Sequence, residues 1–335
     1  MTTVKRAIPY LLAVVASFVA AGIFIALMGF NVVKAFETIL FTSFRTPNGF
    51  IQTLLKFIPL LLLALAFTIP LTAGKFNIGG EGQMIAGGIG AAFVGIMFGN
   101  LPAILLVPLV ILGGIVGGAL WGLIPALLLY KFNINEILTT VLFNFLSLFL
   151  IDYFCTGPWR DPAAGHPTTI AISKAGWLPT LVKNPPLHIG IIIAILVAIG
   201  IYIFTAKTTS GYEMIATGAN PRASRVFGIK VKNMFVLSLV LGGAVAGLAG
   251  AFEVAGNQHR LIEGMQSNFL VLGLIIGLIS KGNNAAVPFV AFMISVLEVG
   301  ASAMQRTMMI PVEMVFIVEA LILLFVLLSD VVRRK

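Results

Sequence analysis

Ten long runs of apolar residues follow one another along this chain, and they constrain its fold more than any other feature. A helix that crosses a membrane needs about 20 apolar residues, and most of the runs are about that long. Two of them are shorter, so we predict about ten spans, with a range of 8–10. The runs are Ala7–Phe30, Ile51–Ala73, Gln83–Phe98, Pro102–Tyr130, Ile137–Thr156, Leu187–Ala206, Met234–Ala255, Phe269–Ser280, Ala285–Met304 and Ile310–Asp330.

The composition agrees with a chain whose main solvent is lipid. Hydrophobic residues make up 59% of it and charged residues only 10%, whereas an ordinary soluble domain has about 25% charged residues. This difference excludes a soluble enzyme, a nucleic-acid-binding protein and a disordered protein. The runs lack the alternating pattern of a membrane β-strand. The predicted fold is therefore an all-α, polytopic transmembrane helical bundle.

The distribution of positive charge predicts how the chain is oriented. With ten spans and a cytoplasmic N-terminus, 13 of the 21 Lys and Arg residues lie on the cytoplasmic side. By the positive-inside rule, both termini are then cytoplasmic. We predict a single transmembrane domain over residues 1–335, with two longer connections. The Pro-rich segment 157–186 is expected to be extracytoplasmic, and the segment 207–233 cytoplasmic.

The cytoplasmic segment carries the start and stop signals of two short helices. Ser210 with Glu213 fits a capping box for the first helix, which Gly218 is expected to end in a left-handed conformation. Asn220 followed by Pro221 is typical of the start of a second helix. The segment also contains the apolar Tyr212, the i,i+3 pair Arg222 and Arg225, and Gly228 as the end of the second helix. A compact protrusion of this kind suggests a surface that contacts a partner protein; the alternative is a loop that packs only on its own bundle.

Several motifs make the sequence similar to a known family. The stretch Gly218–Ser224, within segment 211–229, resembles the coupling segment of ABC importer permeases in the branched-chain amino acid, ribose and nucleoside group. Residues 76–83, which read Phe-Asn-Ile-Gly-Gly-Glu-Gly-Gln, and Asn135-Glu136-Ile137 with Asn144 are similar to two further signatures of that group. The features most similar to its nucleoside and simple-sugar permeases are Gly250–Val254, His259-Arg260, Met304–Arg306, Pro311 and Glu313.

The resemblance implies a subunit of a larger machine in the bacterial cytoplasmic membrane. A second permease subunit, either a non-identical paralogue or a copy of this chain, would complete the pathway. Two ATPase subunits would hold ATP and Mg, and an extracytoplasmic lipoprotein would deliver nucleosides or a related ring-containing solute. This chain itself would bind no cofactor, metal or nucleic acid. Residues implied in coupling to the ATPase are Tyr212, Glu213, Gly218, Asn220, Pro221, Arg222, Arg225 and Gly228.

The chain's own residues agree with an ATPase in trans. No GxxxxGK[ST] phosphate loop occurs, because the pair Gly74-Lys75 is followed by Phe76 and lacks the upstream glycine. The three histidines lack ligand spacing with carboxylates or with Cys155, so no metal site is expected. We predict a transporter subunit rather than an enzyme.

Polar residues at membrane depth are candidates for the translocation pathway or its gate, because their burial in lipid is costly. For each, hydrogen bonding or packing between helices is the alternative. The candidates are Asn77, Glu81, Gln83, Asn144, Glu253 and Glu298, and we assign Glu319 in the last run a structural role.

Two other readings stay open at this stage. The solute could be a ribose-like sugar or riboflavin instead of a nucleoside. The chain could also be an ion-coupled secondary transporter, with Glu253, Glu298 or Glu319 as the proton carrier. A membrane-embedded enzyme finds no support, since no HExxH or other active-site arrangement is present.

Overall fold

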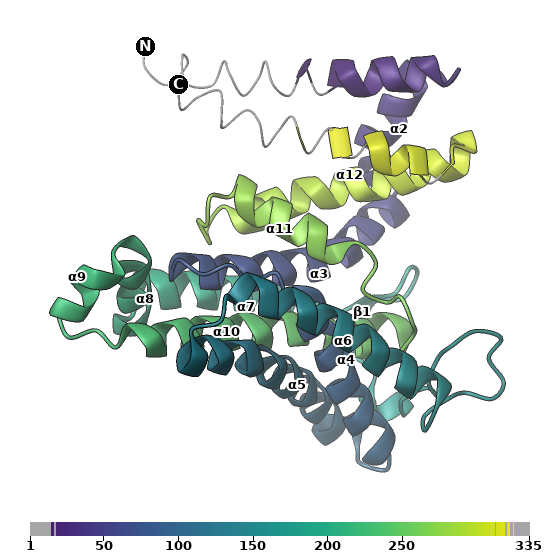
Figure 1. Cartoon of the computed structure of the whole chain (residues 1–335). Coiled ribbons are helices and arrows are strands. Elements are labelled where there is room, and N and C mark those ends of the chain that lie inside the picture. Colours follow the sequence, from purple (N-terminus) through teal and green to yellow (C-terminus); the bar gives the residue numbers. More distant parts are fainter. Residues whose placement is uncertain (1–14, 17, 312, 319, 322–323, 325–335) are drawn as a thin grey trace. The chain divides into compact units, whose positions relative to one another are not determined.

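The computed structural model describes residues 15–16, 18–311, 313–318, 320–321 and 324, and the described chain is mostly helical (Figure 1). The helices are α2 (Val32–Arg45), α3 (Pro47–Thr72), α4 (Gly80–Met97), α5 (Ala103–Phe132), α6 (Glu136–Thr156), α7 (Gly190–Lys207), α8 (Thr209–Ala219), α9 (Pro221–Val226), α10 (Val231–Phe252), α11 (Phe269–Ile279) and α12 (Val287–Met308). The structure also contains a 3-10 turn, η1 (Lys174–Gly176), a π-helix, η2 (Glu253–Gln258), and two short strands, β1 (Thr180–Val182) and β2 (Leu187–His188).

The helices follow the predicted apolar runs closely. Among the described residues, six helices are long and apolar enough to cross a membrane: α3, α5, α6, α7, α10 with η2, and α12. Helix α4 and the shorter α11 coincide with two further runs, and the first run contains the apolar helix Phe18–Leu27. Part of the last run and the start of the first lie outside the described residues. A polytopic helical membrane fold is therefore confirmed, while the count of ten spans and the orientation stay predictions.

The chain divides into two compact units, residues 1–57 with 289–335, and residues 58–288. In the first unit, α2 is a helix that the sequence analysis did not predict. One face of it is buried through Ala35 and Ile39, which pack with Ala301 and Met304 of α12. The contact is close, since a Cβ added at Gly300 would lie 2.0 Å from the Ile39 carbonyl oxygen.

The core of the second unit is a set of three helices, α4, α5 and α10, that meet through glycines. A Cβ added at Gly247 of α10 would lie 2.2 Å from the carbonyl oxygen of Gly114 in α5, and one added at Gly87 of α4 would lie 2.3 Å from the Cα of Gly247. Gly118 and Gly243 approach each other in the same way. Small residues are what allows membrane helices to pack backbone to backbone, so this glycine seam fixes the three helices together.

The Pro-rich segment 157–186 is held on the end of the second unit by the residues after η2. The backbone N–H of Thr169 donates to the Leu261 carbonyl oxygen at 3.0 Å, and the N–H of Ile172 donates to that of His259 at 2.9 Å. The rings of Trp177 and His259 are stacked, with centroids 3.7 Å apart. As expected for a segment so rich in Pro, the only helical element described within it is the three-residue η1.

Candidate functional site

The coupling candidate, segment 207–233, folds into α8 and α9. Asn220 is the N-cap of α9 as predicted, since its Oδ1 accepts from the N–H groups of Arg222 and Ala223 at 3.1 Å each. Pro221 occupies the first turn, and Gly228 is left-handed at φ +84°. The two-helix prediction for this segment is therefore confirmed.

Two details of that prediction are wrong. The N-cap of α8 is Thr208, whose Oγ1 accepts from the Gly211 N–H at 3.1 Å, so Ser210 with Glu213 does not form the expected capping box. The cap falls earlier because Gly211 packs directly on the end of α7, where an added Cβ would lie 2.1 Å from the Phe204 carbonyl oxygen.

Gly218 also has a different role from the predicted one. It lies inside α8, which continues to Ala219, and it is not a left-handed helix end. A Cβ added at Gly218 would lie 2.2 Å from the Thr72 carbonyl oxygen and 2.9 Å from the Gly74 nitrogen. The glycine is required because α8 rests on the turn that follows α3.

The outer surface of α8 and α9 exposes several large apolar side chains. Val226 is 85% exposed, Phe227 84% and Tyr212 69%. A groove of about 490 Å³ lies along the two helices, and its lining includes Tyr212, Glu213, Asn220 and Phe227. Met214, on the opposite side of α8, is fully buried against Ala73 and Met234. One side of this segment is thus anchored in the bundle, and the other side is open to a partner.

The candidate pathway residues Asn77, Gln83 and Asn144 form a buried network around the irregular segment between α3 and α4. Asn77 Nδ2 donates to Gln83 Oε1 at 2.8 Å, and Gln83 Nε2 donates back to Asn77 Oδ1 at 3.0 Å. Asn144 Oδ1 accepts from the Gly82 N–H at 2.9 Å, while its Nδ2 donates to the Ile78 carbonyl oxygen at 2.8 Å. Irregular backbone at membrane depth needs such partners. These hydrogen bonds give the three side chains a structural role, because they hold the irregular segment between α3 and α4 in place. A contact of these side chains with solute stays a prediction.

The three candidate carboxylates are dispersed. Glu81 lies in the first turn of α4, close to Gln266. Glu253 is buried at the start of the π-helix and accepts from Asn257 Nδ2 at 3.0 Å. Glu298 of α12 forms an ion pair with Lys56 of α3, at 3.7 Å between Nζ and Oε1, and so has the partner that its depth requires. Glu319 is outside the described residues.

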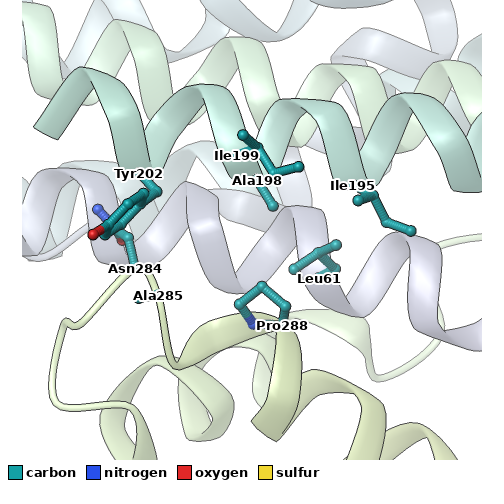
Figure 2. Close-up of a pocket in the computed structure, with 8 residues that line it drawn as sticks. All are labelled: Leu61, Ile195, Ala198, Ile199, Tyr202, Asn284, Ala285 and Pro288. Carbon is teal, nitrogen blue, oxygen red and sulfur yellow. The ribbon is translucent and has the colours of Figure 1, made fainter. Parts of the chain in front are cut away.

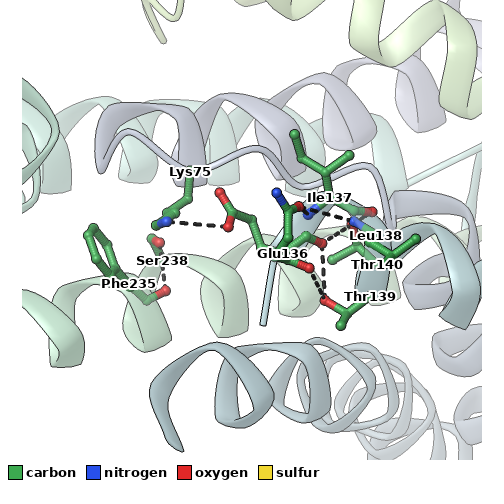
Figure 3. Close-up of polar contacts among 9 residues, drawn as sticks. Lys75, Glu136, Ile137, Leu138, Thr139, Thr140, Phe235 and Ser238 are labelled. Atoms are coloured by element: carbon green, nitrogen blue, oxygen red, sulfur yellow. Dashed lines mark hydrogen bonds and ion pairs between the residues drawn. The ribbon is translucent and has the colours of Figure 1, made fainter. Parts of the chain in front are cut away.

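A buried ion pair that the sequence analysis did not identify lies beside the coupling segment (Figure 3). Lys75 Nζ and Glu136 Oε2 are 3.3 Å apart, with side chains only 18% and 11% exposed. Lys75 also lies over the Phe235 ring, 4.6 Å from its centroid. Asn135 caps α6, accepting from the Ile137 N–H at 2.8 Å, and this places Glu136 in its first turn. Glu136 lies in one of the motifs that suggested the family and Lys75 directly precedes another, but the two residues are far apart in the chain.

An apolar cavity of about 320 Å³ lies between α3, α7 and the residues just before α12 (Figure 2). Its walls are mainly aliphatic, and Tyr202 and Asn284 lie together at one end. Asn284 Nδ2 donates to Thr205 Oγ1 at 3.4 Å. The sequence analysis singled out none of these residues, because it looked for ionisable groups and known motifs.

Comparison with known proteins identifies the family to which this chain belongs. The sequence model for the permease component of branched-chain amino acid transport systems matches residues 49–327. This chain belongs to that permease family. It is accordingly a multi-pass protein of the cytoplasmic membrane and a permease subunit, not a catalytic enzyme.

Curated relatives cover almost the whole permease. A nucleoside ABC transporter permease of Lactococcus lactis is 31% identical over 98% of this chain and 93% of its own length. A glucose ABC transporter permease of Haloferax volcanii is 30% identical over 96% and 87%, and a guanosine ABC transporter permease of Bacillus subtilis is 29% identical over 96% and 93%. No solved structure matches the chain.

Proposed function

We propose that this permease is the membrane-spanning subunit of an ATP-driven importer for nucleosides or a related ring-containing solute. The observation that carries the proposal is its similarity, over nearly the whole chain, to permeases described as transporting nucleosides and guanosine. A simple sugar is the main alternative, since a glucose permease is equally similar. Riboflavin is the other ring-bearing solute to be tested.

The proposed complex contains a second permease subunit, two ATPase subunits that hold ATP and Mg, and a lipid-anchored binding protein that delivers the solute. This chain forms one transmembrane domain, with segment 157–186 on the outer side and segment 207–233 on the cytoplasmic side. It binds no cofactor of its own. The exposed apolar side of α8 and α9 is the proposed contact with an ATPase subunit.

The packing of α8 supports a mechanical role. Gly218 rests on the backbone of Thr72 and Gly74 with no room for a Cβ, and Met214 is buried beside Ala73. A displacement of α8 by an ATPase subunit would therefore move the end of α3 and the irregular segment that follows. Such a motion changes transport only if the ATPase contacts the two states of the permease differently.

The experiment that tests the function is uptake by the reconstituted complex. Proteoliposomes containing both permeases, the ATPases and the binding protein should accumulate radiolabelled guanosine or uridine only with internal ATP. A parallel thermal-shift screen of the binding protein against nucleosides, sugars and flavins identifies the solute class. Uphill uptake by this chain alone, driven by a proton gradient, would instead establish a secondary transporter.

Phe227 provides the test of the coupling surface. Phe227→Ser removes an 84% exposed ring just after the end of α9 and should lower ATP-dependent uptake, with weaker retention of the ATPase subunits. The matched control is Phe98→Ser, which removes a 48% exposed ring at the end of α4. Equal uptake by the two variants would contradict the coupling assignment. Gly218 is unsuitable for this purpose, because any side chain there disturbs packing as well.

The cavity beside α7 is a candidate wall of the solute pathway. It offers aliphatic side chains and the half-exposed Tyr202 ring to a ring-bearing solute. Tyr202→Ala should raise the KM for a nucleoside, whereas Tyr153→Ala, which removes an exposed ring from α6, should not.

A further inference from the structure

A second cavity, of about 330 Å³, is unusually basic for a membrane-embedded bundle. Lys75, Arg225 and Lys232 line it together with a single carboxylate, Glu136. Because Lys75 is paired with Glu136, the other two cations are not neutralised. Among the described residues, neither Arg225 nor Lys232 forms an ion pair. The cavity thus has an excess of two positive charges and no acidic group to balance them.

The two cations come from separate elements that meet at this cavity. Arg225 lies on α9 in the coupling segment, and Lys232 lies in the first turn of α10. Lys232 Nζ donates to the Tyr130 carbonyl oxygen at 2.9 Å and lies 5.3 Å from the centre of the Tyr130 ring, which holds it at the end of α5. The ammonium group of Lys232 has three N–H donors and uses one of them on the Tyr130 carbonyl oxygen, so the others can bind a ligand in the cavity.

The length of α5 predicts that the cavity lies at the level of the lipid headgroups. It is formed where α5 ends and α6 begins. In the most apolar 18-residue stretch of each helix, only 22% of the residues of α5 and 28% of those of α6 are buried inside the protein. With 30 residues, α5 is about 45 Å long, enough to reach through the headgroup layer of a bilayer about 40–45 Å thick. Tyr130, which is 39% exposed at the end of α5, is of the type found at membrane interfaces.

We propose that this cavity binds a phosphate group, and that the phosphate is the headgroup of an anionic phospholipid bridging Arg225 and Lys232. Basic pockets between membrane helices are suited to such headgroups, and both guanidinium and ammonium groups bind phosphate strongly. The bound lipid ties α9 to the ends of α5 and α10, and so stiffens the attachment of the coupling segment. This inference goes beyond the proposed function and does not depend on which solute is transported.

The test uses the intact complex in nanodiscs of phosphatidylcholine, with or without phosphatidylglycerol. Lys232→Gln should reduce the phosphatidylglycerol that remains bound after detergent extraction, measured by mass spectrometry, by about fivefold, since one such cation contributes about 1 kcal/mol. Lys232→Arg should retain the lipid. Lys230→Gln removes an exposed charge two residues away that does not line the cavity, and should behave as wild type.

Three results would overturn the proposal in whole or in part. Equal retention of phosphatidylglycerol by wild type and Lys232→Gln would eliminate the site. Equal loss in Lys232→Gln and Lys230→Gln would show a diffuse surface charge effect and would also overturn it. Thermal stabilisation by inorganic phosphate in pure phosphatidylcholine, lost in Lys232→Gln, would keep the phosphate site but replace the lipid by free phosphate.

Discussion

The glycine seam between α5 and α10 predicts that a single added methyl group is strongly destabilising. In Gly247→Ala, the new Cβ would lie 2.2 Å from the Gly114 carbonyl oxygen and 2.8 Å from the Gly118 Cα. Ordinary contact begins at 3.4 Å, so the two backbones must separate by more than 1 Å. Because backbone atoms cannot rotate away as side chains do, we expect a loss of about 3 kcal/mol in unfolding free energy, at the upper end for overpacking.

The matched control is Gly200→Ala in α7, where no atom lies within 4 Å of the added Cβ. That substitution should be neutral or stabilising by up to about 1 kcal/mol, because Ala favours helix over Gly. Both variants can be compared by titrating the purified permease from mild detergent into dodecyl sulfate and following Trp fluorescence. If the two unfolding free energies agree within about 0.5 kcal/mol, the seam does not constrain the packing and the reasoning fails.

Three further predictions concern polar groups. Burial, with a smaller effect from nearby His259, lowers the pKa of His188 to about 4, whereas the pKa in an unfolded chain is about 6.5. The unfolded state therefore binds the proton first as the pH falls. The unfolding free energy should be at its full value above pH about 6.5 and fall by up to about 3 kcal/mol as the pH approaches 4. His188→Asn keeps an acceptor for the Gly190 N–H and should flatten that dependence in thermal melts across pH. For the Lys75–Glu136 pair, Lys75→Met and Glu136→Gln should each lower the unfolding free energy, and the double variant should lose about 1–2 kcal/mol less than their sum, measured as a double-mutant cycle. Asn144→Leu should cost about 3 kcal/mol in the same unfolding titration, because it leaves the Gly82 N–H and the Ile78 carbonyl oxygen without partners; a stability equal to wild type would exclude the bracing role.

The membrane helices were predictable because length and apolar composition suffice to locate them. The helix α2 was missed for the same reason. It has 14 residues and buries one face only, so a search for runs of about 20 apolar residues passes over it. The recurrence of Val32, Ala35, Phe36 and Ile39 at helical spacing would have revealed it.

Local signals in the coupling segment were only partly sufficient. Asn220-Pro221 determined the start of α9, since both residues act within the first turn. Ser210 and Gly218 were assigned wrongly because close packing on α7 and on the turn after α3 overrides the local signal. The sequence contains no local trace of such contacts.

The sequence predicted which polar residues belong to the candidate site, but not which of them lie in contact with one another. Asn77 and Gln83 belong to one motif and Asn144 to another, and only the fold shows that they brace the same segment. The pair Lys75–Glu136 joins positions 61 residues apart, and a single sequence read by itself gives no means of pairing them.

The backbone contacts among α4, α5 and α10 also limit how this permease can move. Helices separated by long side chains can slide by changing rotamers, whereas helices in direct main-chain contact cannot shift without losing their whole interface. We therefore expect the three helices to move as one body, so that alternation between outward-open and inward-open states would take place at its borders. A displacement of α9 would then be passed to this body through the short connection 227–230 that leads into α10.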